Sequence, residues 1–141
     1  MSNRIIALVG CLLVLGMCLS ACTADAEEAG KAPVAASELI SGKPHKLPIS
    51  GMVTMVDIGA HACIPCKMMT PVIAELSKEY EGRAAIAFID VWEYREEGAK
   101  YNIRSIPTQI FYDAQGKEQY RHVGFLDKKS IVAKLKELGV R

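Results

Sequence analysis

The sequence predicts an α/β fold in which helices cover both faces of a mixed central sheet. Two strand-length apolar runs, at residues 52–58 and 84–91, are rich in β-branched side chains and have the character of buried central strands. A helical pattern lies between them, and a strand pair with a short turn follows later. Parallel strands joined by helices, followed by an antiparallel hairpin, require such a mixed and two-sided sheet.

The first predicted helix starts near Cys63 and Cys66 and runs to about Tyr80, before Gly82. Pro71 lies inside this helix and removes a backbone hydrogen bond, so we expect a bend there and no chemical role. The apolar positions recur at helical spacing, at Met68, Met69, Val72, Ile73, Leu76 and Tyr80.

The second half of the chain continues the same alternation. A weaker helix is predicted at residues 94–101, and strands are predicted at 108–112 and 118–123 with a turn at 113–116 between them. Gly124 then separates the hairpin from a last helix. The apolar face of that helix consists of Ile131, Val132, Leu135 and Leu138.

The N-terminal end predicts export. Residues 5–19 carry no charge and are mostly apolar, a length that suits a signal-peptide core and is short for a spanning helix. The run Leu19-Ser20-Ala21-Cys22 resembles the bacterial lipobox, in which the cysteine is lipidated; the alternative is an ordinary secretory signal. We expect a lipoprotein signal peptide at 1–21, a flexible tether at 22–36 and one domain at 37–141.

The charge balance excludes one class of partner. Removal of residues 1–21 takes away Arg4, so the 17 basic residues of the chain become 16, against 16 acidic ones. A neutral protein has no basic excess to replace counterions on a phosphate backbone. We therefore expect no nucleic-acid partner.

The cysteines point to redox chemistry. Cys11 and Cys18 lie in the predicted signal peptide and Cys22 carries the lipid, so only Cys63 and Cys66 remain free. One close pair is not the framework of a disulfide-stapled mini-protein. At a helix start, unpaired N–H groups and the helix dipole favour a thiolate. Cys63 is the predicted nucleophile, and Cys66, which is deeper, is the resolving thiol.

The neighbours of the pair complete the predicted active-site motif. Pro65 fits the first helical turn, where its missing N–H would be unpaired anyway. Lys67 adds a positive charge, whereas Ile64 offers no side-chain donor to a thiolate. The motif therefore consists of an apolar pair between the cysteines and a cation after them.

A C-x-x-C pair also occurs in metal sites and haem attachment sites. Zinc would need two more ligands, and the histidine candidates are His45, His61 and His122, with no second C-x-x-C in the chain. A c-type haem signature would need histidine in place of Lys67. A purely structural disulfide would close too short a loop to stabilise much. We expect no metal, with a metal carrier or binding module as the alternative.

Several motifs agree in order and spacing with one family. Asp57 lies six residues before Cys63, the run from Cys63 to Lys67 follows, and then come Pro71 and Ile106-Pro107-Thr108. Over residues 50–140 the chain resembles the thioredoxin family. Within it, the chain is most similar to exported lipoproteins and to domains that exchange electrons with membrane thiol transporters.

The resemblance implies a thioredoxin-like fold and further site residues. It implies that Asp57 is buried, with a raised pKa, and accepts the proton of the resolving thiol, usually through water. It also implies a cis peptide bond before Pro107 beside the dithiol, where Ile106 and Pro107 shape the substrate groove.

The chain departs from the family at informative positions. Gly59 and Ala62 stand where tryptophans are usual, and Ile64 replaces the usual glycine. Ile86 occupies the position where a lysine often accompanies the buried acid. These departures leave the reduction potential of the Cys63–Cys66 pair open. The apolar Ile64 favours a reductant. His61 is expected to be an exposed loop histidine and not a group that tunes the thiolate.

Together these features predict an extracytoplasmic thiol:disulfide oxidoreductase that reduces partner proteins through Cys63 and Cys66. The expected cofactor is none besides its own redox-active disulfide. Expected partners are exported proteins with disulfides or dithiols and a membrane thiol electron transporter. We expect a monomer, lipid-anchored on the periplasmic or cell-surface side. A disulfide oxidase or isomerase is the alternative within the same chemistry.

Overall fold

The computed structural model describes residues 34–141. The predicted signal peptide, Cys22 and the tether up to residue 33 lie outside this part of the chain. The elements follow in the order α1 (Ala36–Leu39), β1 (Thr54–Gly59), α2 (Ile64–Glu79), β2 (Ala85–Asp90), α3 (Arg95–Lys100), β3 (Thr108–Tyr112), β4 (Glu118–Val123) and α4 (Lys128–Glu137). No helix among the described residues is long and apolar enough to cross a membrane.

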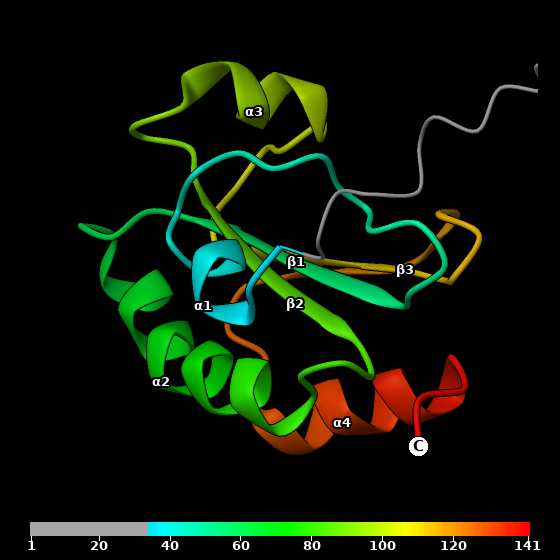
Figure 1. Cartoon of the computed structure of the whole chain (residues 1–141). Coiled ribbons are helices and arrows are strands. Elements are labelled where there is room, and N and C mark those ends of the chain that lie inside the picture. The colour runs from blue at the N-terminus through cyan, green and yellow to red at the C-terminus, as the bar shows by residue number, and fades with distance from the viewer. Residues whose placement is uncertain (1–33) are drawn as a thin grey trace, which may run out of the picture. The chain divides into compact units, whose positions relative to one another are not determined.

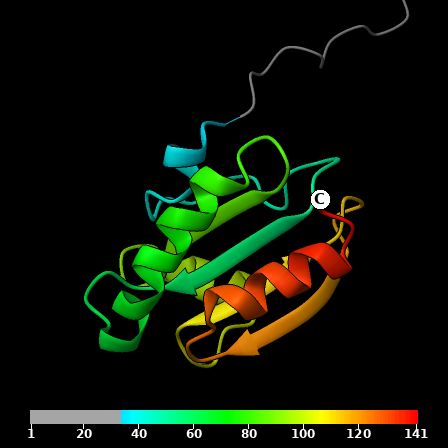
Figure 2. The same ribbon diagram turned by 90° about the horizontal axis from the view of Figure 1, so that it is seen from below.

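The strands form one mixed sheet in the order β2-β1-β3-β4. β1 runs parallel to β2 and antiparallel to β3, and β3 pairs antiparallel with β4. Figures 1 and 2 show α2 and α4 side by side on one face of the sheet, with α3 on the other. The predicted mixed sheet with helices on both faces is therefore confirmed.

β1 lies in the middle of the sheet and is buried along its whole length. Successive side chains of a strand point to opposite faces. Met55 therefore joins the core under α2 and α4, and Val56 and Ile58 join the core on the α3 face. Asp57 has the same parity as Met55, so an ionisable side chain enters the helix-covered core between α2 and β1.

Two details differ from the sequence prediction. The first strand starts at Thr54, because Thr54 Oγ1 donates to the carbonyl of Met52 (3.0 Å) and accepts from the N–H of Ile49 (3.1 Å), which closes a turn. Helix α1 is not among the predicted elements, since four residues are too few for a periodic pattern. Leu39 anchors α1 in the α3-side core.

Candidate active site

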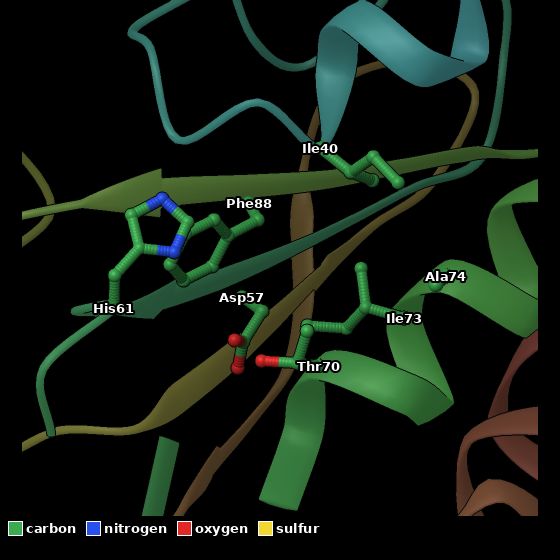
Figure 3. Close-up of a pocket in the computed structure, with 7 residues that line it drawn as sticks. All are labelled: Ile40, Asp57, His61, Thr70, Ile73, Ala74 and Phe88. Carbon is green, nitrogen blue, oxygen red and sulfur yellow. The ribbon is translucent and has the colours of Figure 1, made fainter. Parts of the chain in front are cut away.

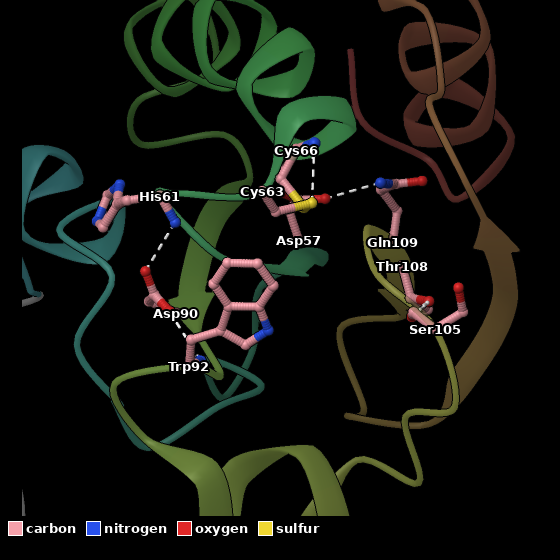
Figure 4. Close-up of a disulfide and its surroundings, with 9 residues drawn as sticks. All are labelled: Asp57, His61, Cys63, Cys66, Asp90, Trp92, Ser105, Thr108 and Gln109. Carbon is pink, nitrogen blue, oxygen red and sulfur yellow. Dashed lines mark hydrogen bonds between the residues drawn. A yellow bond between two sulfur atoms is a disulfide. The ribbon is translucent and has the colours of Figure 1, made fainter.

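Cys63 is the N-cap residue of α2, and Cys66 lies in the first turn (Figure 4). Cys63 has extended backbone angles (φ −77°, ψ 125°), and its Sγ accepts a hydrogen bond from the N–H of Cys66 at 3.4 Å. The two residues form a disulfide with a Cα–Cα distance of 5.2 Å. Pro65 occupies the first turn, where an N–H is not needed. Cys63 thus lies at the start of the helix, as the sequence predicts.

The surface beside the disulfide is apolar. Ile64 is 78% exposed, and Lys67 is exposed after the pair. Ile106 packs against Cys63 and Cys66 from the loop before β3. The Ile106–Pro107 peptide bond is cis, as the family resemblance implied. A docked polypeptide would therefore meet the side chains of Ile64 and Ile106 next to the sulfur atoms.

Asp57 lies beneath Cys66. A Cβ at Gly59 would come within 3.3 Å of both Cβ and Sγ of Cys66, so Cys66 covers this end of β1. Asp57 is two residues earlier and on the same face of the strand. It is fully buried, and this burial raises its pKa from the ordinary 3.8 to about 7, against the lowering effect of a hydrogen bond from Gln109. A carboxyl with this pKa can exchange a proton near neutrality.

Gln109 is the polar partner of Asp57 and was not predicted from the sequence. Its Nε2 donates to Asp57 Oδ1 at 2.7 Å, and Gln109 is as fully buried as Asp57. Among the described residues no partner is found for Asp57 Oδ2 or Gln109 Oε1. A long amide side chain among the β-branched and aromatic residues of the third strand was the signal that could have found it.

A pocket of about 60 Å³ leads toward Asp57 from the side of α1 (Figure 3). Its polar side chains are Asp57, His61 and Thr70, and Figure 3 shows the Thr70 hydroxyl facing the carboxyl. A water needs about 10–15 Å³ of such space and polar partners, so this pocket has room for water. The remaining lining residues are Ile40, Ile73, Ala74 and Phe88.

The His61 side chain packs against Phe88 and does not face the sulfur atoms. Its ring packs edge-on against Phe88 with 5.0 Å between centroids, and Figure 4 shows the ring turned away from Cys63. The side chain is exposed. The position of this ring agrees with the loop interpretation of His61.

Asp90 joins two loops near the dithiol and is a second residue that was not predicted from the sequence. Its carboxylate accepts from the N–H of His61 (2.7 Å), of Trp92 (2.8 Å) and of Glu93 (3.2 Å). Asp90 is buried at the end of β2. The carboxylate therefore joins the loop before Cys63 to the loop after β2. Figure 4 shows the indole of Trp92 on that second loop, beside the disulfide.

Metal ligands do not gather near the pair. Within residues 34–141 no group of three or more His, Cys, Asp or Glu side chains could hold an ion. His45 contacts the carbonyl of Glu38, and His122 contacts that of Phe125. The histidines considered as zinc ligands thus have other partners.

The chain is similar to known thioredoxins in sequence and in structure. The thioredoxin family model matches residues 45–137. Thioredoxin 2 of Chlorobaculum tepidum is 44% identical over 88 residues, covering 62% of this chain and 80% of that protein. Thioredoxin of Staphylococcus aureus is 43% identical over 79 residues, covering 56% and 75%. The crystal structure of Malassezia sympodialis thioredoxin (Mala s 13) matches with a TM-score of 0.54 and 27% identity, over 62% of this chain and 76% of that one.

A buried acid beneath a disulfide at a helix start defines a class of redox protein, and the chain belongs to the thioredoxin family. It is a protein-disulfide oxidoreductase whose redox centre is the Cys63–Cys66 pair.

Proposed function

We propose that this protein is an extracytoplasmic reductase of protein disulfides, held at the membrane by a lipid on Cys22. The observation that carries the catalytic part is the placement of Cys63 as N-cap of α2, with Cys66 in the first turn and Asp57 beneath it. Cys63 is the nucleophile, Cys66 the resolving thiol and Asp57 the proton acceptor.

The reaction moves two electrons to the substrate. The Cys63 thiolate attacks one sulfur of a substrate disulfide, so a mixed disulfide forms and the first substrate thiolate leaves. The Cys66 thiol then gives its proton to the Asp57 carboxylate through water, and the resulting thiolate attacks Cys63 Sγ. The second substrate thiolate leaves, and Cys63 and Cys66 end as a disulfide. Two protons, one from Cys66 by way of Asp57 and one from solvent, convert the two released thiolates into thiols.

The surroundings of Cys63 favour the reducing direction. A protein disulfide is a strong oxidant when the dithiol form that it gives on reduction is stabilised. Among the described residues, Cys63 Sγ accepts one hydrogen bond, from the N–H of Cys66. The exposed Ile64 adds no donor. Lys67 adds a positive charge only from an exposed position. The thiolate therefore gains little beyond the helix terminus, and the dithiol readily gives up its electrons.

The N-terminal sequence supports the location. Residues 5–19 have the length and composition of a signal-peptide core, and the lipobox-like run ends at Cys22. An exported reductase needs electrons from across the membrane, because the secretory side is oxidising. A membrane thiol transporter is the partner of suitable chemistry, and exported proteins with disulfides are the substrates.

Trapping of mixed disulfides tests the assigned roles. Cys66→Ser removes the resolving thiol, so Cys63 should remain bound to substrates during mild oxidation, in adducts that dithiothreitol releases. The matched control Cys63→Ser should trap none. Adducts that form equally in Cys63→Ser, or that are missing from Cys66→Ser, would show that Cys63 is not the nucleophile.

A further inference from the structure

Asp57 and Gln109 form a cross-strand pair inside the core. They are direct register partners between β1 and β3, so their side chains leave the sheet on the same face. Both are fully buried, and Gln109 Nε2 donates to Asp57 Oδ1 at 2.7 Å. The register partner of Asp57 on the other side is Phe88, which offers no hydrogen bond. The polar contact of the carboxyl within the sheet is thus the Gln109 amide.

The Gln109 amide can offer the Asp57 carboxyl either a donor or an acceptor, as a group that gains and loses a proton requires. Asp57 Oδ2 and Gln109 Oε1 both lack a partner among the described residues. A primary amide carries donors on one side and an acceptor on the other, and the two ends have almost the same shape. A half-turn of the amide about its last bond would present Oε1 to Asp57 in place of Nε2.

We propose that Gln109 is a positioning residue for thiol exchange, whose amide hydrogen-bonds Asp57 in both protonation states. It donates Nε2–H to the ionised carboxylate and, after the half-turn, accepts O–H from the protonated acid through Oε1. The inference rests on the role proposed above for Asp57. It adds the group that keeps the carboxyl in one place while a proton from Cys66 arrives and leaves.

An apolar side chain at position 109 would serve neither state, but the two losses are unequal. The bond to the carboxylate is charge-assisted and stronger than the bond to the neutral acid. Removing the amide therefore penalises the ionised form more. The pKa of Asp57 should rise further, and less carboxylate should be available to accept the proton of Cys66 at neutral pH.

Other titratable groups around the pair are few. Helix α2 contributes Cys66, and the loop before it contributes His61 at the mouth of the pocket. Asp90, at the end of β2, is bound to backbone N–H groups. β4 contributes His122, the register partner of Gln109, which contacts the carbonyl of Phe125. None of them replaces the direct bond between Gln109 and Asp57.

The test is Gln109→Leu in the full chain in detergent, with Gln109→Met as a second apolar variant in case leucine packs badly. The matched control is Gln119→Leu, which removes a similar amide from the exposed Asp113. Carbon-13 NMR of the aspartate carboxyls, assigned with Asp57→Asn, reads the pKa of Asp57 directly. Stopped-flow kinetics read the resolution of the mixed disulfide as a function of pH.

We expect both Gln109 variants to raise the pKa of Asp57 by about one unit or more, the size typical of one lost charge-assisted hydrogen bond. At pH values well below the pKa of Asp57 in the parent, resolution by Cys66 should slow about tenfold, in proportion to the carboxylate lost, while the attack by Cys63 keeps its rate. Gln119→Leu should change neither. An unchanged pKa in both Gln109 variants would overturn the proposal. A raised pKa, with resolution in Asp57→Asn as fast as in the parent, would overturn the role of Asp57 instead.

Discussion

Asp57 makes the stability of the fold depend on pH. Its carboxyl has an ordinary pKa of 3.8 in the unfolded chain and about 7 in the folded one, chiefly because of burial. Between these values the folded chain binds a proton that the unfolded chain has lost. The free energy of unfolding therefore falls as pH rises through this window. The full penalty is present above the folded pKa and amounts to about 4 kcal/mol, at about 1.4 kcal/mol for each pKa unit.

Asp57→Asn should remove this pH-dependent loss of stability. We expect the variant to be more stable than the parent at about pH 8 and to lose most of that advantage at about pH 4. Denaturant unfolding of both oxidised proteins at the two pH values measures this. Asp113→Asn is the control of opposite sign, because hydrogen bonds hold the pKa of the exposed Asp113 below its ordinary value. A parent that gains stability relative to Asp57→Asn on going to high pH would contradict the burial argument.

Among the elements, the contact between the loop before Cys63 and the loop after β2 depends on Asp90. Its carboxylate accepts a hydrogen bond from the N–H of His61, which lies 29 residues earlier in the chain. It also accepts from the N–H groups of its near neighbours Trp92 and Glu93. The N–H of Val91 also donates to the carbonyl of Gly59 at 2.9 Å. The approach to Cys63 is thus held from β2 and from the end of β1.

Asp90→Ala should loosen this contact between the loops and leave three part-buried N–H groups without their acceptor. We expect a loss of about 3 kcal/mol in the free energy of unfolding, because each bond to a charged acceptor contributes about 1.5–3 kcal/mol and water replaces part of the loss. Calorimetry or denaturant unfolding checks the stability. Hydrogen exchange at His61 and Trp92 should speed up more than exchange in β3. Equal stability of Asp90→Ala and the parent would rule out this function of the carboxylate.

The elements that carry a local pattern could be predicted from the sequence. The apolar runs of β1 and β2 and the helical spacing of α2 place Cys63 at a strand-to-helix junction without any tertiary information. Gln109 and Asp90 could not be predicted in the same way. Gln109 is 52 residues from Asp57, and their contact depends on the antiparallel register of β1 and β3. Asp90 gains its function only when two distant loops meet.

At the scale of the whole molecule, the proposed function joins a folded redox domain to a lipid anchor. The chain should be processed at Cys22 and fractionate with membranes, since diacylation holds a protein far more firmly than one chain. Cys22→Ser should abolish lipid labelling and release the protein from the membrane or leave it unprocessed. Mass spectrometry of the mature N-terminus decides between the two kinds of signal. A mature N-terminus other than a lipidated Cys22 would exclude the lipoprotein assignment.

The proposed function requires that the Cys63–Cys66 dithiol works as a reductant. Its most direct test is an equilibrium titration of the purified oxidised protein in glutathione and dithiothreitol redox buffers, with the thiol state of Cys63 and Cys66 read by alkylation and mass. We predict a reduction potential close to the value of about −270 mV for thioredoxin and below the glutathione couple. A potential near about −120 mV, typical of a strong disulfide oxidant, would contradict the assignment as a reductase.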